Sequence, residues 1–352
     1  MKIAIVSGGT GGHIYPGLAI AEEIKKRDQE VSILFLGSEE GLEKELILRE
    51  GYRIKLIKSR ALLRKLSYKA ISAPFISAIG VFQSLWVLKS FSPKVLISTG
   101  GYASLPLIIA ARLLGIPIIF QEQNVLPGAV NRFCYRLAKK IFLSFEESLK
   151  YIPGEVVGNP VRRGIIEANR EEARKRLGLL PGEKVVLVMG GSQGSKKLNE
   201  TVLSSLPQIP SNIKVLHIIG NRDFGWVNRY LEGREIKNYQ AFPYLHNMAD
   251  ALAAADLVVS RAGATAISEF LVRALPMILI PFPYAAEDHQ RLNAKAIAEK
   301  GGAIVIEEEV FTPDKFISII SDSALNYDKM RNALVKLASI NAAERIVDFV
   351  YQ

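Results

Sequence analysis

The stretch from Val6 to Gly17, which reads VSGGTGGHIYPG, holds the residues best placed for chemistry. An apolar run, 3–6, precedes it and a helix-like run, 18–26, follows it, so the pattern predicts a strand, a glycine turn and a helix. Glycines let the backbone turn sharply and approach a ligand closely, and the unpaired amides at a helix start attract anions. We therefore expect a site for a phosphate, or for a negative charge that develops during a reaction.

His13 falls in the first turn of the predicted helix. The positive end of the helix dipole disfavours imidazolium there, so we expect a neutral ring that can accept a proton. The plain alternative is a helix-start residue bonded to the backbone. The spacing is not the dinucleotide fingerprint, because the glycines are paired and Gly37 and Ser38, not an acidic residue, follow the second strand. A nicotinamide cofactor is therefore not expected.

A second glycine turn, 99–104, follows another predicted strand. Neighbouring parallel strands end at one sheet edge, so the two turns could lie side by side and hold two phosphates of one anion, or two anions. After the next strand, 121–124 reads QEQN, and catalytic groups tend to gather at such strand ends. Glu122 could act as a base there or could merely cap the next helix.

The second half of the chain carries a third glycine turn, 189–195, in which the Ser192 hydroxyl could donate a hydrogen bond to a phosphate. Further on, 261–269 reads RAGATAISE, a small-residue turn that opens a helix. Glu269 in this helix could compensate the helix dipole, or its paired oxygens could accept both hydroxyls of a ribose. The polar loop 287–293 could read sugar hydroxyls if it faces Glu269.

Composition narrows the class of protein. The 352 residues are 49% hydrophobic and 23% charged, which is ordinary for a globular chain with room for two domains. A formal charge of +10 favours an anionic partner, which could be nucleic acid, a membrane surface or a phosphorylated substrate. Nucleic acid is the least favoured of the three, because the chain lacks basic motifs interleaved with aromatic residues. One cysteine and four scattered histidines predict neither a disulfide framework nor a metal site. The first residues run directly into a strand, so we expect no signal peptide.

Apolar strand-like runs alternate with longer helical segments, which predicts an α/β fold with two doubly wound parallel sheets. A stretch rich in arginine and glycine, 153–170, is the expected linker between them. Two such domains would leave a ligand-binding cleft between the carboxyl ends of their strands. The predicted strands are 2–6, 31–36, 95–98, 116–120 and 140–143 in the first series, and 184–189, 213–219, 256–259, 276–280 and 303–306 in the second.

The segment 60–94 departs from this pattern, since nineteen uncharged residues lie between Lys69 and Lys89. Its proline, glycine, glutamine and serines, and the basic residues at both ends, argue against a transmembrane helix. We expect an amphipathic segment with an exposed apolar patch and a basic rim, suited to an anionic membrane surface. Ordinary core helices packed on the sheet are the alternative. The apolar residues concerned are Phe75, Ile76, Ile79, Phe82, Trp86 and Leu88.

Taken together, motifs that recur in order over nearly the whole chain resemble the MurG family, the N-acetylglucosaminyltransferases of peptidoglycan synthesis. These motifs are GGTGGH at 8–13, TGGY at 99–102, QEQN at 121–124, VVGNPVR at 156–162, GGSQG at 190–194 and RAGATAISE at 261–269. The resemblance implies the GT-B glycosyltransferase fold, two Rossmann-like domains facing a cleft. It implies an acceptor- and membrane-binding domain at 1–160, a UDP-sugar-binding domain at 161–339, and a final helix, about 340–352, that returns to the first domain.

The implied reaction moves N-acetylglucosamine from UDP-N-acetylglucosamine to the 4-hydroxyl of the muramoyl sugar of lipid I, the undecaprenyl-diphosphate-linked muramoyl-pentapeptide, with inversion. The implied enzyme needs no metal and no cofactor, binds an anionic membrane surface peripherally on the cytoplasmic side of the inner membrane, and binds no nucleic acid. The absence of an Asp-x-Asp motif agrees, because helix ends and backbone amides can neutralise the leaving UDP.

Site residues follow from the same resemblance. In the first domain, Thr10, Gly11 and Gly12 would line the donor side of the first turn, and Asn124 would contact the transferred sugar. Our own hypothesis for the mechanism is an in-line displacement in which either His13 or Glu122 is the general base. On the donor side, Leu245 would form a boundary of the uracil pocket. Glu269 would bind the ribose, and Gln290 would contact the sugar hydroxyls. Arg162 and Ser192 would hold the nucleotide and diphosphate, and the helix start Ala264, Thr265, Ala266, Ile267 and Ser268 would meet the diphosphate and sugar. Two departures matter: Ala264–Ala266 permutes the more usual Ala-Leu-Thr, and His289 stands where some members carry a second glutamine.

Two other functions fit parts of the pattern. A UDP-N-acetylglucosamine 2-epimerase shares the two-domain fold, but it would act on the donor alone and would need no lipid-facing patch. A non-catalytic nucleotide-sugar-binding module is disfavoured because His13 and Glu122 both lie at predicted strand ends.

Overall fold

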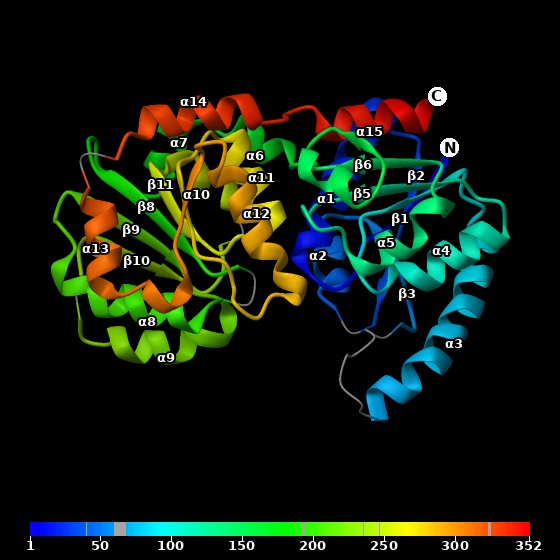
Figure 1. Ribbon diagram of the computed structural model, residues 1–352, viewed down its shortest axis with the longest axis horizontal. Coiled ribbons are helices and arrows are strands. Elements are labelled where there is room, and N and C mark those ends of the chain that lie inside the picture. Colours follow the sequence, from blue (N-terminus) through cyan, green and yellow to red (C-terminus); the bar gives the residue numbers. More distant parts are fainter. Residues whose placement is uncertain (40, 60–67, 192–193, 235, 246, 323–324) are drawn as a thin grey trace. The chain divides into compact units, whose positions relative to one another are not determined.

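The computed structural model describes residues 1–39, 41–59, 68–191, 194–234, 236–245, 247–322 and 325–352, and for 68–77 the backbone alone. The chain divides into two compact units (Figure 1). The first unit comprises Met1–Arg162 together with Ser339–Gln352, and the second comprises Arg163–Ala338. Each unit is a twisted parallel sheet with helices on its faces, so the predicted α/β class is confirmed.

The first unit holds a seven-stranded parallel sheet in the order β3-β2-β1-β4-β5-β6-β7. Its strands are β1 (Lys2–Val6), β2 (Ser32–Ser38), β3 (Arg53–Ile57), β4 (Val95–Ser98), β5 (Ile118–Glu122), β6 (Lys140–Leu143) and β7 (Glu155–Val156). Its helices are α1 (Gly11–Arg27), α2 (Glu43–Arg49), α3 (Tyr68–Phe91), α4 (Ser104–Leu113), α5 (Ala129–Cys134) and α15 (Ala342–Tyr351), with the short helices η1 (Tyr135–Leu137) and η2 (Glu146–Lys150).

The two faces of this sheet are separated by the alternation of side chains along its strands. On β1, Ile3 and Ile5 belong to a buried cluster with side chains of α1, α2 and α15, whereas Ala4 and Val6 belong to a cluster with α3 and α4. The final helix α15 therefore packs beside α1, although more than three hundred residues separate them in the chain. This arrangement leaves the carboxyl edge of the sheet free for the turns that follow its strands.

The second unit holds a six-stranded parallel sheet in the order β10-β9-β8-β11-β12-β13. Its strands are β8 (Lys184–Met189), β9 (Ile213–Ile218), β10 (Tyr239–Phe242), β11 (Leu257–Ser260), β12 (Met277–Leu279) and β13 (Ala303–Val305). Its helices are α6 (Arg163–Glu167), α7 (Arg170–Arg176), α8 (Lys196–Ser205), α9 (Asn221–Leu231), α10 (Met248–Ala254), α11 (Ala264–Val272), α12 (His289–Ala298), α13 (Pro313–Ser321) and α14 (Tyr327–Leu337), with η3 (Leu206–Gln208), η4 (Ala286–Asp288) and η5 (Glu308–Val310).

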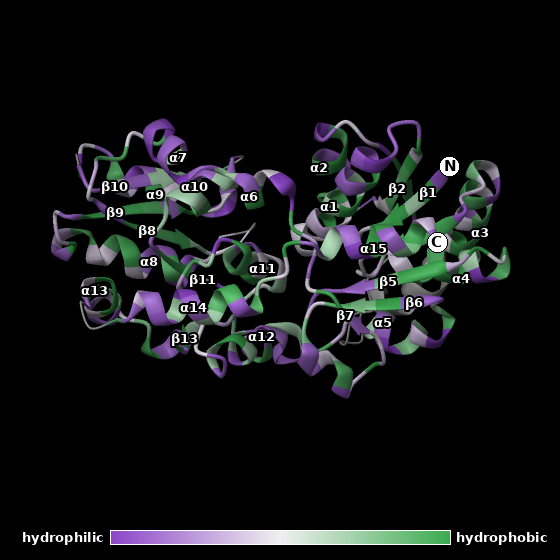
Figure 2. Cartoon of the chain, turned by 90° about the horizontal axis from the view of Figure 1, so that it is seen from above, coloured by the Kyte–Doolittle hydropathy of each residue, from purple (hydrophilic) through white to green (hydrophobic). Residues whose placement is uncertain are grey.

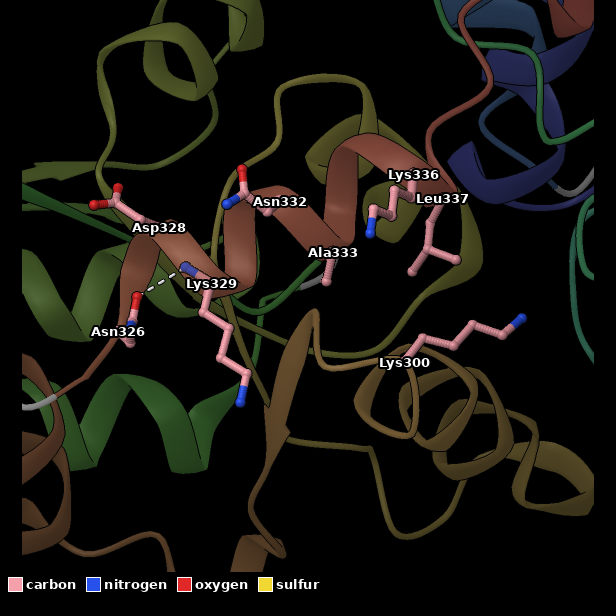
Figure 3. Close-up of a pocket in the computed structure, with 8 residues that line it drawn as sticks. All are labelled: Lys300, Asn326, Asp328, Lys329, Asn332, Ala333, Lys336 and Leu337. Atoms are coloured by element: carbon pink, nitrogen blue, oxygen red, sulfur yellow. Dashed lines mark hydrogen bonds between the residues drawn. The ribbon is translucent and has the colours of Figure 1, made fainter.

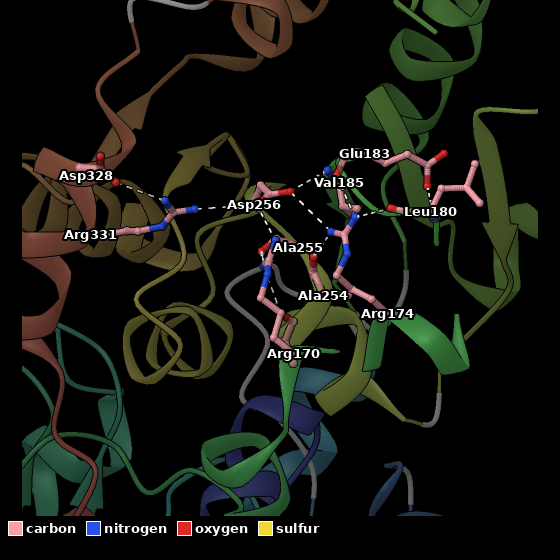
Figure 4. A network of polar contacts seen from close by, with 11 residues as sticks. Arg170, Arg174, Leu180, Glu183, Val185, Ala254, Ala255, Asp256, Asp328 and Arg331 are labelled. Atoms are coloured by element: carbon pink, nitrogen blue, oxygen red, sulfur yellow. Dashed lines mark hydrogen bonds and ion pairs between the residues drawn. The ribbon is translucent and has the colours of Figure 1, made fainter. Parts of the chain in front are cut away.

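The core of the second unit lies between this sheet and helices α8, α9 and α13, whose buried faces carry Leu198, Val227 and Phe316. Figure 2 shows the same division by hydropathy, with the inner strands mainly hydrophobic and the outer helices mixed. An ion-pair network at the starts of β8 and β11 links these strands to neighbouring helices (Figure 4). Asp256 accepts from the Val185 amide at 2.8 Å and pairs with Arg170 at 2.7 Å, which ties the start of β8 to α7 and to the start of β11.

The sequence prediction missed three strands, β3, β7 and β10. All three lie at the edge of a sheet, where one strand flank has no neighbour. Along β3 (Arg53–Ile57), exposed and partly buried residues alternate, so the segment lacks the continuous apolar run that marks an inner parallel strand. The inner strands were predicted to within two residues because both of their faces are covered by helices.

Helix α3 has one side buried in the core and another side exposed, so it has features of both the core helix and the amphipathic segment. Ser84 and Leu88 are buried, and Leu88 packs into the core beneath the sheet. Ile79, Phe82 and Trp86 are exposed, with exposed fractions of 47%, 74% and 71%, and we call these three residues the α3 apolar surface. Residues 60–67 and the side chains of Phe75 and Ile76 lie outside the described part. No helix within the described ranges combines the length and the apolar character that crossing a bilayer requires.

A glycine prediction tests how closely the turns of the first sheet pack. Gly101 has φ +88°, and a Cβ atom there would overlap the carbonyl oxygen of Gly8. We expect Gly101→Ala to destabilise the first unit by about 3 kcal/mol or more, measured by urea unfolding. Gly115, with φ +69° and open space around it, is the matched control, and Gly115→Ala should cost only about 1 kcal/mol. Equal losses would mean that the two turns are not tightly packed.

Candidate functional site

Two glycine turns meet at the carboxyl edge of the first sheet. β1 and β4 are paired in parallel, and the Gly8 amide in the turn after β1 donates to the Gly100 carbonyl in the turn after β4, at 3.3 Å. A Cβ atom on Gly8 would lie 2.7 Å from the Cβ atom of Ala103, so only glycine permits this approach. The prediction that these turns lie side by side is confirmed.

Helix α1 starts directly from the first turn. Thr10 is its N-cap residue, and the Thr10 side chain makes no capping hydrogen bond. Gly11 is buried, Thr10 and Gly12 are exposed, and the first turn of α1 contains no acidic residue. In the turn itself, the Gly9 amide donates to Oε1 of the buried Glu43 at 2.7 Å. Anion binding at this helix start stays a prediction.

His13 is oriented from one side of its ring. Its Nδ1 atom lies 2.9 Å from the Thr99 carbonyl oxygen and 2.8 Å from Oε1 of Gln123. Gln123 is held in this orientation because its Nε2 donates to the Thr99 carbonyl at 2.7 Å. Both atoms facing Nδ1 are acceptors, so Nδ1 carries the hydrogen, and in the neutral ring Nε2 carries the lone pair. The half-buried ring can therefore accept a proton at Nε2.

Glu122 is bonded very differently. Its side chain is 1% exposed, at the end of β5. Oε1 accepts from the amide and the side-chain nitrogen of Asn124, at 2.9 and 3.3 Å, and Oε2 accepts from the Gly128 amide and from Nδ2 of Asn131, at 2.9 and 2.8 Å. Both oxygens are thus occupied by donors from the loop that follows β5 and from α5. This arrangement orders the loop that presents Asn124.

Arg162 lies at the end of the first unit, and its guanidinium group stacks over the ring of Tyr15 in α1, 4.3 Å from the ring centroid. Tyr15 lies in α1, close in sequence to the predicted site residues Gly12 and His13. Stacking holds the cation against the helix that carries His13, which the sequence motif alone did not indicate.

The third glycine turn follows β8 in the second unit. Ser192, its predicted phosphate ligand, lies outside the described residues. At the end of this turn Ser195 is the N-cap residue of α8, and its hydroxyl oxygen accepts from Arg261 at 2.8 Å. The buried Arg261 also pairs with Glu308 and donates to the carbonyls of Ile280 and Pro281. Arg261 thus joins three loops of this edge, a role that its place in the RAGATAISE motif did not predict.

The predicted donor residues of α11 divide into two groups. Ala264, Thr265 and Ala266 form the first turn of the helix, which contains no acidic residue. The Ile267 side chain is fully buried, and the Ser268 hydroxyl donates to the Ala264 carbonyl within the same helix, at 2.8 Å. Glu269 is 7% exposed and lies one turn further along.

Gln290 belongs to the same edge of the second sheet. Its Oε1 accepts from the amides of Ala262 and Phe282, at 3.2 and 3.0 Å, which positions it beside the turn that opens α11. The half-buried Leu245 lies in the segment after β10, an edge strand that β9 and β8 separate from β11. The loop leading to Gln290 is strained, since Glu287 and Asp288 have φ values of +54° and +55°.

Two further observations concern a possible metal site and a pocket. Within the described ranges, no group of three or more His, Cys, Asp or Glu side chains is arranged to hold a metal ion. An open pocket of about 630 Å³ lies along one face of α14, where Lys300, Lys329 and Lys336 contribute to its lining (Figure 3). None of the predicted site residues lines this pocket.

Comparisons with known proteins agree with this geometry. Residues 3–143 match the glycosyltransferase family 28 N-terminal domain, and residues 185–348 match the glycosyltransferase family 28 C-terminal domain. A protein of Thermoanaerobacter sp. is 38% identical over 99% of both chains, and one of Halalkalibacterium halodurans is 37% identical over 98% of both. Both are named UDP-N-acetylglucosamine--N-acetylmuramyl-(pentapeptide) pyrophosphoryl-undecaprenol N-acetylglucosamine transferase.

Solved structures are similar over the same length. The crystal structure of MurG from Acinetobacter baumannii superposes with a TM-score of 0.76, at 28% identity over 99% of both chains. A UDP-GlcNAc 2-epimerase from Neisseria meningitidis superposes with a TM-score of 0.69 over the full length of both, but at 15% identity. The second likeness extends to the fold alone.

The bonding of Glu122 leads to a stability prediction. Glu122→Ala would leave four hydrogen-bond donors without their acceptor, so we expect a loss of about 3 kcal/mol in the free energy of unfolding. Glu122→Gln keeps one acceptor oxygen and should lose roughly half as much. Glu45, exposed on α2, provides the control variant Glu45→Ala, which should unfold like the parent. Parental stability of Glu122→Ala in urea unfolding would contradict the anchoring role.

Proposed function

The chain belongs to the MurG family of N-acetylglucosamine transferases, and from this premise we propose which of its residues carry out the reaction. The enzyme is a glycosyltransferase that moves N-acetylglucosamine from UDP-N-acetylglucosamine to lipid I in peptidoglycan synthesis. We propose His13 as the general base. The observation that supports this choice is the fixed Nδ1–H of His13, which leaves Nε2 as the proton acceptor.

In the proposed step, Nε2 of His13 takes the proton of the acceptor 4-hydroxyl as the oxygen attacks the anomeric carbon of the donor sugar. The bond from that carbon to the β-phosphate oxygen breaks, and the electron pair leaves with UDP. Attack opposite the leaving group inverts the anomeric centre. Backbone amides at helix starts stabilise the departing diphosphate, so the step needs no metal ion.

Glu122 has a supporting role in this proposal. A base needs a lone pair that can reach the substrate, and both carboxylate oxygens of Glu122 already accept hydrogen bonds in a buried setting. Its contribution is to order the 123–128 loop, so that Asn124 can contact the transferred sugar.

The donor is assigned to the second unit. Here the starts of α8 and α11 supply amides for the diphosphate, with the hydroxyls of Ser192 and Thr265, and Glu269 accepts the ribose hydroxyls. Leu245 bounds the uracil, and Gln290 reads sugar hydroxyls with its amide nitrogen, since its oxygen is bonded to the backbone. In the first unit, Thr10, Gly11, Gly12 and Arg162 are assigned to substrate binding. The acceptor and the membrane contact are assigned to the first unit.

The membrane contact is assigned to the α3 apolar surface. An exposed stripe of Ile79, Phe82 and Trp86 is unusual on a helix whose opposite face is already buried in the core. Exposed basic residues lie nearby along the chain, at Lys89 and Lys94, and suit anionic lipid headgroups. We assign the enzyme to the cytoplasmic face of the inner membrane as a peripheral protein, with no nucleic-acid partner.

Kinetics test the choice of base. We expect His13→Ala to lower kcat by roughly 10²–10⁴-fold with saturating donor, while the Kd for UDP stays near the parental value, because only proton transfer is lost. Glu122→Gln, which keeps the size of the anchor, should lower kcat far less. A His13→Ala enzyme that turns over at the parental rate would remove His13 from this role. Formation of the 2-epimer from donor alone would instead indicate the epimerase reaction.

Vesicle binding tests the membrane contact. We expect Phe82→Glu or Trp86→Glu to weaken binding to vesicles that contain anionic phospholipid by about tenfold, because a charge replaces buried apolar area at the interface. Transfer to a water-soluble acceptor analogue should remain parental. Leu48, exposed on α2, provides the control variant Leu48→Glu, which should bind vesicles normally. Equal loss of activity on both acceptors would assign α3 a purely structural role.

A further inference from the structure

A chain of buried polar side chains crosses the core of the second unit. Nδ1 of His217, on β9, lies 2.9 Å from the hydroxyl of Tyr239, and Nε2 lies 3.0 Å from Oδ1 of Asn199 on α8. Asn199 donates from Nδ2 to Oδ2 of Asp223 at 2.9 Å. Asp223, at the start of α9, also pairs with the exposed Arg222 at 3.0 Å. His217 and Asn199 are fully buried, so these bonds form without competition from water.

The direction of each hydrogen bond among these buried side chains follows from the two groups that can only accept. Asp223 and the Ile219 carbonyl can only accept, so both receive hydrogens from Nδ2 of Asn199, and its Oδ1 must face His217. Nε2 of His217 therefore carries the hydrogen, and Nδ1 accepts from the hydroxyl of Tyr239. Burial lowers the pKa of His217 to about 3, so the ring stays neutral and this pattern persists at ordinary pH.

This chain reaches the glycine turn that follows β8. Asn199 donates to the Ile219 carbonyl at 3.1 Å, and a Cβ atom on Gly194 would overlap that same carbonyl oxygen. The backbone at Gly194 thus packs directly against the Ile219 carbonyl, which accepts from the Asn199 side chain. Asn199 also lies in the first turn of α8, where its amide donates to the carbonyl of Ser195, the residue that ends the turn. The side chain of Asn199 therefore fixes the carbonyl that supports the turn, and its backbone amide bonds the residue that ends the turn.

We propose that His217, Asn199 and Asp223 are positioning residues for the donor diphosphate, acting through Gly194 and the Ile219 carbonyl. The proposal rests on the function proposed above, in which the amides at the start of α8 bind the diphosphate. A helix start binds an anion well only if its amides are held at the correct place before the ligand arrives. Glycines such as Gly194 restrict the backbone little by themselves, and the buried chain of side chains supports Gly194 from below.

The test compares two asparagines of the second unit in the full chain. Asn199→Ala removes the link to the turn, and Asn238→Ala removes two similar bonds, to the carbonyls of Ile209 and Pro210, before the start of β10. We expect Asn199→Ala to raise the Kd for UDP, by calorimetry, and the KM for UDP-N-acetylglucosamine about tenfold, with kcat changed much less. The same values for Asn238→Ala should stay within about twofold of the parent.

A second pair of variants separates positioning from general loss of structure. Asp223→Asn keeps an oxygen that can accept from Asn199 and should bind UDP within about threefold of the parent, whereas Asp223→Ala should match Asn199→Ala. This pair decides the question if Asn199→Ala does not fold. Similar UDP affinity in Asn199→Ala, Asn238→Ala and the parent would overturn the positioning role. Failure of the parent chain itself to bind UDP would instead overturn the proposed donor site.

Discussion

The close contact between the backbones of two glycine turns is the constraint on which the rest of the first unit depends. The Gly8 amide meets the Gly100 carbonyl, and the space around Gly8 and Gly101 admits no Cβ atom. Because β1 and β4 are neighbours, this contact places His13 against Thr99 at the edge of the sheet. A larger residue at either position would separate the helix start from the group that orients the histidine.

The same edge illustrates how two similar polar residues acquire different uses. His13 and Glu122 both follow strand ends, but the surrounding donors and acceptors differ. The histidine meets two acceptors at Nδ1, so in the neutral ring Nε2 carries the lone pair. The carboxylate meets donors at both oxygens and is enclosed, which suits the ordering of a loop. Burial and hydrogen-bond direction thus distinguish the surroundings of these two side chains.

The second unit solves a related problem with buried side chains. Its glycine turn rests on the Ile219 carbonyl, and Asn199, His217 and Asp223 hold that carbonyl from within the core. Arg261 ties the end of the turn to two other loops. Gly194 at the end of this turn is therefore supported through hydrogen bonds from the protein core beneath it.

The sequence by itself determined the fold class, the inner strands and the three glycine turns. Apolar runs that are buried on both faces are visible without any structure, and glycine spacing reports where the backbone must turn sharply. The ordered motifs also indicated the family, which the comparisons confirmed. Edge strands such as β3 were missed because half of their surface is not covered, so their composition resembles that of a loop.

Only the tertiary structure decided which partners each polar residue meets. Gln123 orienting His13, Asn131 bonding Glu122 and Tyr15 stacking on Arg162 all join residues whose meeting depends on the fold. Likewise, α3 buries Leu88 and exposes Phe82, although both belong to the same uncharged segment of the sequence. Hydrogen-bond direction and burial are properties of neighbours in space, and a single sequence records only neighbours along the chain.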